Sequence, residues 1–368
     1  MDLSHKFASL SYLMLRFIAL CLLLLQNSIT TIAQWRAPKY SNEFLAIGTG
    51  AAGLAMSGAQ TAFVSDVTSS YWNPAGLANL EKKTEVSLMH ASYFGGIANY
   101  DYAAVATRID SLSTLGFSYI RFGVDDIPDT RLLIDNGQVD YRRISTFSSV
   151  DNAYIFSYGR KNVFLPGMSF GGNFKVIYRK AGQFANAWGF GLDAGIQYKI
   201  KKWKLAVMAR DVTTTYNAWS YNTSEFESVF SQTGNAIPVS SVEITLPTWT
   251  FGLCRAIPIF KDKILVNPVL DLVTTFDGKR NTLIKTNVFS MDPRFGLELK
   301  AYNLVALRGG VSGWQKIKNF DHSENWNYQV NFGVGLQWKA ISIDYAITDL
   351  GNLAEALYSH VFSIKASF

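Results

Sequence analysis

The stretch WGFGLDAGIQYKI, residues 188–200, alternates large apolar side chains with glycine and polar side chains along its whole length. Trp188 and Phe190 begin the apolar series, and Gly189 and Asp193 belong to the polar one. Because successive side chains of a β-strand point to opposite faces, the pattern predicts a strand with one apolar and one polar face. The run exceeds the roughly 5–6 residues of an ordinary strand and matches the about 9–11 residues of a tilted membrane-crossing strand.

Two further runs, Met168–Tyr178 and Tyr328–Trp338, show the same period. Alternation alone suits a soluble sandwich as well as a membrane barrel, because both have strands with one apolar face. The length of the runs favours the barrel, and so does the C-terminal strand His360–Phe368, which resembles the signal read by the barrel-assembly machinery. Tryptophans also stand at strand ends, as in an interfacial girdle. They are Trp188, Trp203, Trp249 and Trp338.

The same period predicts 14 strands between residues 84 and 368. Their connections alternate between short ones, such as Lys201–Lys202, and mostly longer ones, such as Gly123–Val150 and Thr213–Pro247. Outer-membrane barrels show this alternation of short periplasmic turns with long external loops. We therefore predict an all-β, 14-stranded antiparallel transmembrane β-barrel with both termini in the periplasm. The strands are expected to begin near Val86, Tyr100, Thr114, Asp151, Met168, Trp188, Trp203, Trp249, Ile264, Arg294, Leu304, Tyr328, Ile341 and His360.

Residues 1–33 have the features of a secretory signal peptide. A weakly basic lead precedes the apolar run Phe17–Leu25, and small residues precede Gln34. The alternative is an N-terminal anchor helix, but the run is shorter than the ~20 residues that span a bilayer. We predict cleavage before Gln34 and residence of the mature chain in the cell outer membrane.

Residues 34–83 differ from the rest, because they are rich in glycine, alanine and serine and contain no long alternating run. The segment is too poor in bulky side chains to form a core of its own, so we predict a plug inside the barrel lumen. Gly50, Gly53 and Gly58 would let it pack closely against the wall. Asn73 and Pro74 are a favoured N-cap and first helical residue, and they predict a short helix there.

Residues 48–53, GTGAAG, fit the dinucleotide fingerprint, with Asp66 at a plausible distance. The fingerprint works only at a strand-to-helix turn within a βαβ unit. Here an Asn-Pro turn and antiparallel-type strands follow, so we interpret the glycines as packing residues.

Catalytic and metal-binding patterns are weak. His90, His322 and His360 are scattered, so we predict no enzyme, metal site or cofactor. The net charge of +6 forms no basic block, which argues against nucleic acid. Past residue 33 the only cysteine is Cys254, so no intramolecular disulfide is possible. Charges expected on the lumen face are interpreted as a paired, hydrated interior, namely Lys175, Arg179, Asp193, Lys199, Arg210 and Glu298.

The connection Thr213–Pro247 is predicted to be the longest loop and is rich in aromatic residues. Exposed aromatic side chains at this density often mark a partner-binding surface. The alternative is that they fold over the barrel mouth as a lid. The candidate partner-binding residues are Trp219, Tyr221, Phe226 and Phe230, with Tyr216 beside them.

The segment GAAGLAMSGA at residues 50–59, then Asp66, then YWNPAGLA at residues 71–78, resembles the N-terminal motif of the PorV/PorQ group. These are FadL-like outer-membrane proteins of the Bacteroidetes. The resemblance implies a 14-stranded barrel with an N-terminal plug. It also implies a role in type IX secretion, through binding of the C-terminal signal domain of exported cargo or of translocon or attachment-complex proteins.

The resemblance also leaves a second function open, because FadL-like proteins admit hydrophobic small molecules through a side opening. A continuous apolar path from the barrel mouth to the wall would favour this channel function. A sealed lumen beneath an exposed aromatic surface would favour protein docking. In both cases outer-membrane lipid surrounds the barrel.

Overall fold

The computed structural model describes residues 41–135, 137–225, 227, 240–261, 263–318, 321–349 and 359–368. The predicted signal peptide, the expected mature start at Gln34, and the candidate residues Phe226 and Phe230 lie outside these ranges. Within them, no helix combines the length and the apolarity needed to cross a bilayer.

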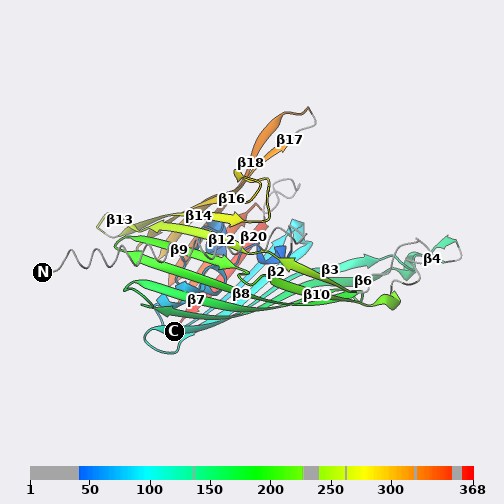
Figure 1. The fold of residues 1–368 in the computed structure, drawn as a ribbon, viewed down its shortest axis with the longest axis horizontal. Coiled ribbons are helices and arrows are strands. Elements are labelled where there is room, and N and C mark those ends of the chain that lie inside the picture. The colour runs from blue at the N-terminus through cyan, green and yellow to red at the C-terminus, as the bar shows by residue number, and fades with distance from the viewer. Residues whose placement is uncertain are drawn as a thin grey trace. The chain divides into compact units, whose positions relative to one another are not determined.

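The barrel wall, drawn in Figure 1, is one antiparallel sheet. It closes on itself because β1 pairs with β20. Its strands occupy 14 positions, which confirms the predicted fold class. In order around the wall they are β1 (Thr84–Tyr93), β2 (Ala98–Arg108), β3 (Ser113–Asp129), β6 (Ser145–Lys161), β7 (Met168–Ala181), β8 (Ala185–Ile200), β9 (Trp203–Arg210) with β10 (Thr215–Tyr221), β11 (Ser240–Thr245) with β12 (Thr248–Arg255) and β13 (Ile257–Ile259), β14 (Ile264–Thr275), β16 (Ser290–Ala301), β17 (Val305–Lys318), β18 (Glu324–Trp338), β19 (Ile341–Thr348) and β20 (Ser359–Ser367).

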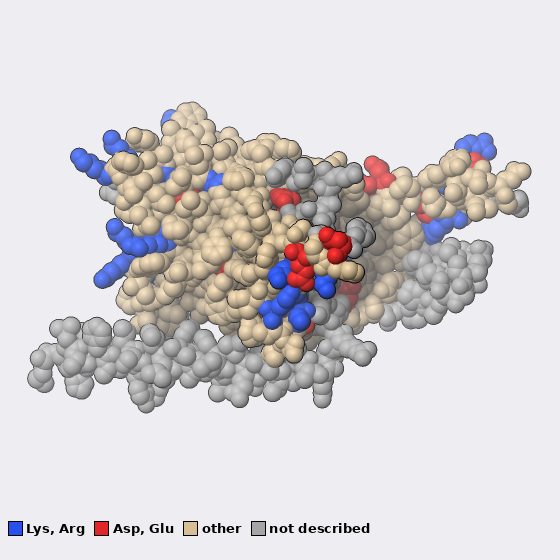
Figure 2. All heavy atoms as spheres, turned by 90° about the horizontal axis from the view of Figure 1, so that it is seen from above, with Lys and Arg blue, Asp and Glu red and all other residues tan. Residues whose placement is uncertain are grey.

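The wall strands turn apolar side chains outward and polar or small ones inward. On β8, Trp188 and Phe190 are 50% and 51% exposed, whereas Asp193 is buried on the lumen side. In Figure 2 uncharged residues cover most of the wall, while lysine and arginine stand out at its left end and a mixed group of basic and acidic residues lies near the middle of the view, with further charges on the extension at the right. A bilayer covers the uncharged part of the wall without leaving a charge in hydrocarbon.

The plug consists of four short helices inside the barrel: η1 (Glu43–Leu45), α2 (Ala51–Ala55), α3 (Ser69–Trp72) and η2 (Pro74–Asn79). Asn73 caps η2, because its side chain accepts a hydrogen bond from the Ala75 backbone N–H at 3.1 Å, and Pro74 is the first helical residue. The Asn73 Nδ2 atom donates to the carbonyl of Ile196 on β8, and this bond fixes the cap against the wall.

Plug and wall meet where the wall strands carry glycine. Gly159, Gly171 and Gly195 are direct neighbours across β6, β7 and β8. A Cβ atom at residue 159 would come within 2.7 Å of the Pro74 carbonyl oxygen, and one at residue 171 would overlap the Pro74 backbone. These strands therefore allow η2 to pack directly on the wall backbone.

Two pairs of strands continue beyond their neighbours and form arms. β3 runs to Asp129 and β6 starts at Ser145, so part of the expected connection Gly123–Val150 is strand. Between them lie β4 (Ile134–Asp135), β5 (Gln138–Val139) and η4 (Tyr141–Arg143). The β17–β18 pair likewise continues past its last contact with β16 at Val311. The remaining elements are η3 (Phe94–Gly96), η5 (Thr223–Glu225) and β15 (Ile284–Lys285).

A candidate binding chamber beside a break in the wall

A cavity of about 290 Å³ lies in the lumen between the plug and the inner wall. Its floor is made by the plug, including Leu45, Tyr71 and Trp72. Its sides come from β6, β7, β8, β9, β11, β12, β14 and β16 and from the connections that adjoin them. We call this cavity the chamber. Its volume is at the lower end of the range for small-molecule sites.

The chamber reaches the wall where two adjacent strands are interrupted at the same level. Residues 211–214 separate β9 from β10, and residues 246–247 separate β12 from β11. Asp211 and Thr214 have positive φ angles of 54° and 62°, and Pro247 has no N–H to donate. Asp211, Leu246 and Pro247 all line the chamber. We call residues 211–214 and 246–247 the wall break.

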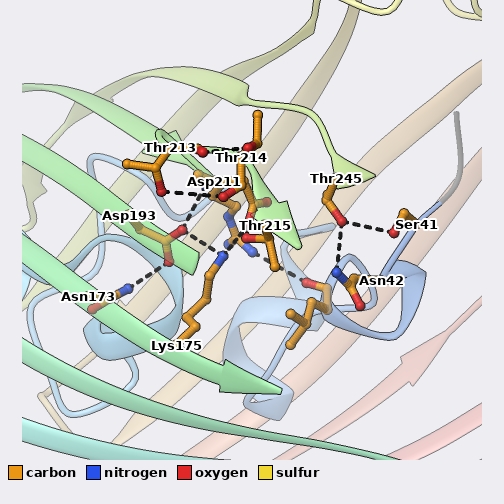
Figure 3. A network of polar contacts seen from close by, with 12 residues as sticks. Ser41, Asn42, Asn173, Lys175, Asp193, Asp211, Thr213, Thr214, Thr215 and Thr245 are labelled. Atoms are coloured by element: carbon orange, nitrogen blue, oxygen red, sulfur yellow. Dashed lines mark hydrogen bonds and ion pairs between the residues drawn. The ribbon is translucent and has the colours of Figure 1, made fainter. Parts of the chain in front are cut away.

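A buried ion cluster supports the wall break from inside (Figure 3). The Lys175 ammonium lies 2.7 Å from the Asp193 carboxylate and 2.6 Å from the Asp211 carboxylate. Asp193 also accepts the Asp211 backbone N–H at 2.9 Å, and Thr215 donates to Asp211. The side chains of Lys175 and Asp193 are only 5% exposed. The cluster therefore fixes the strand where its pairing with β8 is interrupted.

The same cluster is connected to the plug. Asn173 donates to Asp193 at 3.1 Å and to the Ser70 carbonyl of α3 at 3.0 Å. At the other side of the wall break, Asn42 donates to Thr245 at 2.8 Å. A displacement of α3 would therefore disturb the residues that hold the wall break.

The floor of the chamber is fixed by Arg210. Its guanidinium donates to the backbone carbonyls of Leu45 and Tyr71 at 3.3 and 3.1 Å, and it lies over the Tyr71 ring. Arg210 thus satisfies plug carbonyls and does not pair with a carboxylate at hydrogen-bond distance among the described residues.

The opposite side of the chamber carries a second group of charges. Arg280 donates to Asp277 at 2.6 Å, whereas Arg294 stays 3.9 Å from Asp292. Burial raises the pKa of Glu43 in the plug, and the nearby Arg280 opposes this shift. The chamber therefore combines charges of both signs with the apolar side chains of its floor.

The predicted lumen charges lie on the inner wall, mostly in pairs. Arg179 contacts Asp151 and Glu243 at 2.9 and 3.1 Å. The Glu298 carboxylate accepts a hydrogen bond from the Arg308 guanidinium at 2.8 Å. Lys199, near the short-connection end of β8, is exposed. Among the described residues no three His, Cys, Asp or Glu side chains are grouped so that they could hold a metal ion.

The described residues among the predicted partner-binding aromatics lie on a strand and not in a long loop. Trp219 and Tyr221 lie on β10, which extends the wall, and their rings stack with centroids 6.4 Å apart. Arg179 lies over the Trp219 ring at 5.0 Å, and Tyr216 is 51% exposed. The strands β10 and β11 thus replace both ends of the expected loop Thr213–Pro247. The sequence did contain a signal for strand β10, because residues 216, 218 and 220 alternate with Asn217 and Trp219.

Two of the three predicted plug glycines, Gly53 and Gly58, lie against Trp72. A Cβ atom at Gly53 would lie 2.8 Å from the Trp72 indole nitrogen, and one at Gly58 would lie 3.2 Å from its ring. Gly50 has a positive φ of 76° and precedes α2, which has only five residues. The glycine pattern at residues 48–53 therefore lies in a packed plug, without the βαβ unit that dinucleotide binding needs.

Fold and chamber together define the class of this protein as a transmembrane β-barrel with a lumenal plug and a chamber beside a wall break. No family model and no curated relative matches the chain. Solved structures with FadL-like barrels do match its fold. The toluene transporter TbuX of Ralstonia pickettii aligns with a TM-score of 0.52 and 14% identity, over 87% of this chain and 98% of that chain.

Two other solved structures give the same result. The toluene transporter TodX of Pseudomonas putida aligns with a TM-score of 0.52 and 13% identity, over 87% of this chain and 96% of that chain. The CymD monoaromatic hydrocarbon channel aligns with a TM-score of 0.53 and 12% identity, over 88% of this chain and 98% of that chain. At these identities the likeness establishes a shared fold.

Proposed function

We propose that this protein is an outer-membrane channel that takes up small hydrophobic molecules and releases them sideways through the wall break. The observation that carries the proposal is the contact between the chamber and the wall break at Asp211, Leu246 and Pro247. The fold shared with two toluene transporters and a monoaromatic hydrocarbon channel supports the same class of cargo. We place both termini in the periplasm, because an even number of strands leaves them on the same side and the short connections are expected on the periplasmic side.

A sideways route suits a hydrophobic solute for a physical reason. A route along the barrel axis would have to pass the plug, whose Trp72 and Leu77 are buried and whose backbone packs on wall glycines. Outside the wall break, by contrast, lies hydrocarbon, where an apolar molecule is more stable than in water by roughly 25 cal/mol per Å² of its surface. Release through the wall therefore requires no movement through the plug.

Uptake of radiolabelled toluene by intact cells tests this function. Cells of a heterologous Gram-negative host that produce the protein should take up toluene faster than cells with an empty vector. Equal rates in the two strains, with the barrel demonstrably present in outer-membrane fractions, would argue against the channel. A radiolabelled hexose, which is polar, measures non-specific leakage.

A second candidate function is docking of proteins in type IX secretion. The observation in its favour is the tight packing of the plug motif at residues 71–78, which carries the PorV/PorQ resemblance, against the wall. Such packing hinders passage of a solute along the axis, but it is compatible with a scaffold that binds cargo signal domains or translocon partners. The aromatic pair Trp219–Tyr221 would supply a contact surface.

Affinity purification from native outer membranes in mild detergent tests docking. If the barrel retains secretion partners, replacing Tyr221 of this aromatic pair by alanine should weaken their recovery. Tyr141→Ala on η4 is the control, since Tyr141 is exposed but lies on the β3–β6 arm. Recovery of the barrel without any secretion component would remove this candidate.

A further inference from the structure

The two ends of the barrel differ in charge. At the end that carries the short connections, exposed lysine and arginine side chains predominate, and they stand out at the left of Figure 2. They are Lys82, Lys83, Arg160, Lys199, Lys201, Lys202, Arg255, Lys261, Lys263 and Lys339. The exposed acids described at the same end are Glu81 and Asp110. The opposite end carries charges of both signs, such as the ion pair of Lys316 with Glu324.

Five of these cations lie at the ends of two adjoining hairpins, β8–β9 and β12–β14. They are Lys201, Lys202, Arg255, Lys261 and Lys263, and we call them the basic rim. The Ala256 backbone N–H donates to the Lys202 carbonyl at 3.0 Å, so the two hairpin ends are in contact. Within the described ranges no ion pair joins any of the five to a carboxylate. Asp262 lies outside these ranges.

The basic rim lies beside aromatic rings on the outer face of the wall. Trp203 pairs with Ile200, which is the last of the outward-facing side chains of β8. Arg255 pairs with Trp203 across β9 and β12, and its guanidinium lies 4.9 Å from the centre of the indole ring. The Lys263 ammonium lies 6.0 Å from the centre of the Tyr302 ring, on the next hairpin. Because such aromatic girdles lie at the level of the lipid head groups, these cations face the head-group layer.

The position of these cations favours lipid over a protein partner. The bilayer surrounds the outer face of the wall at the level of the girdle, so lipid meets a cation there first. The same pairing recurs farther round this end, where the Lys339 ammonium lies 5.2 Å from the Trp338 ring centre. Repetition around the rim suits a membrane, which contacts every side of the barrel, better than a single docked protein. Long basic side chains also reach lipid phosphates while their methylene groups stay on apolar surface.

We propose that the basic rim binds the phosphate groups of anionic phospholipids in the leaflet at the short-connection end of the barrel. A zwitterionic head group carries its own ammonium ion beside the phosphate, so it gains less from the same cations than a head group with a net negative charge. The rim thus selects lipids by head-group charge. This inference goes beyond the channel function and does not depend on it, because it requires only that the barrel lies in a bilayer.

Two lipids with the same acyl chains and different head groups test the preference. The purified full chain, delipidated in detergent, is titrated separately with phosphatidylglycerol and with phosphatidylcholine, and native mass spectrometry counts the bound molecules. Phosphatidylglycerol should bind at least about fivefold more tightly at low ionic strength, and the difference should shrink as salt is added. Equal affinities would overturn the proposal, and an acidic protein would then be the partner that this surface fits.

Variants of the rim connect the preference to the named side chains. Lys201→Gln/Lys202→Gln/Arg255→Gln should reduce the preference for phosphatidylglycerol to less than about twofold, because three of the five charges are gone. Lys201→Arg/Lys202→Arg/Arg255→Lys keeps the charges and should keep the preference. The heat-modifiable migration of the folded barrel in electrophoresis shows that each variant has assembled. An unchanged preference in the glutamine variant would overturn the assignment to the rim.

The matched control removes three exposed cations at the other end of the barrel. Lys180→Gln/Lys285→Gln/Lys318→Gln lowers the net charge by the same amount and should leave the lipid preference as in wild type. An equal loss of preference in this variant would mean that the net charge, and not the rim, attracts the lipid.

Glycerol phosphate distinguishes a lipid head group from a soluble anion. It carries a phosphate without acyl chains, so nothing holds it beside the wall, and it should not bind detectably at the lipid concentrations used. Binding of glycerol phosphate as tight as that of phosphatidylglycerol would identify a site for a soluble anion and overturn the assignment to lipid.

Discussion

Gly195 on β8 faces Asn73 of the plug so closely that a Cβ atom at residue 195 would overlap the Asn73 side-chain oxygen. The same asparagine caps η2 and donates to the Thr61 carbonyl at 3.0 Å, so it connects two parts of the plug with the wall. The glycine is therefore required by the close approach of the plug. The position of the plug follows from residues on β6, β7 and β8 as much as from its own sequence.

The first prediction concerns this contact. Gly171→Ala should destabilise the barrel by about 1–3 kcal/mol or more, because its Cβ would overlap the Pro74 backbone, which cannot rotate away. Gly172→Ala is the matched control, since the nearest atom to its Cβ lies at an ordinary 3.6 Å. Denaturant unfolding in detergent measures both. Equal stability of the two variants would mean that the plug does not pack on the row of wall glycines formed by Gly159, Gly171 and Gly195.

The second prediction concerns the other face of the plug. Gly53→Trp should prevent normal assembly, because a Cβ at this residue already lies 2.8 Å from the Trp72 indole nitrogen and the site has no room for a second indole. The heat-modifiable migration of folded barrels in electrophoresis reports assembly. A Gly53→Trp protein that migrates like wild type would contradict a plug inside the lumen.

The third prediction concerns pH. Burial alone would raise the pKa of Asp66, but the Lys365 ion pair at 2.5 Å and hydrogen bonds from Thr68 outweigh it and lower the pKa. The ionised carboxylate therefore stabilises the docked plug above its unfolded-state pKa of about 3.9, and this contribution is lost as the pH falls through the lower folded-state pKa. Asp66→Asn should lower the melting temperature at pH 7, and the difference from wild type should disappear in strong acid. A difference in melting temperature that grows as the pH falls would contradict this prediction.

The fourth prediction concerns the ion cluster. Lys175→Met should cost about 3–5 kcal/mol, because it leaves the Asp193 and Asp211 carboxylates buried without a counter-ion. Neutralising the acids as well, in Lys175→Met/Asp193→Asn/Asp211→Asn, should recover much of the loss. Chemical denaturation of the single and triple variants provides the comparison. If the triple variant were less stable than Lys175→Met, the cost would come from lost packing and not from unpaired charge.

Much of the wall could be predicted from the sequence, because lipid on one side and a polar lumen on the other impose a period of two. The expected strand starts at Met168, Trp203, Ile264 and Ile341 coincide with the observed ones. The expected start of β6 at Asp151 is six residues too late, since β6 begins at Ser145. Along the arms no bilayer constrains the outward side chains, so the alternation weakens there.

The chamber could not be predicted in the same way. The wall break depends on a positive φ at Asp211, and aspartate gives only a weak signal for it. The partners of Lys175 come from β8 and from the segment after β9, and only the register of three strands brings them together. The wall glycines opposite the plug likewise share no sequence motif.

Removal of Val212 and Thr213 tests the central claim most directly. The deletion makes the two interruptions equal in length, two residues opposite residues 246–247, and so lets β9 and β10 pair continuously with β12 and β11, while the mismatch against β8 falls from three residues to one. Val212→Ala/Thr213→Ala keeps the break and is the control. With both barrels present in equal amounts in the outer membrane, toluene uptake should fall to the empty-vector rate in the deletion variant and remain in the control. Undiminished uptake by the deletion variant would contradict release through the wall.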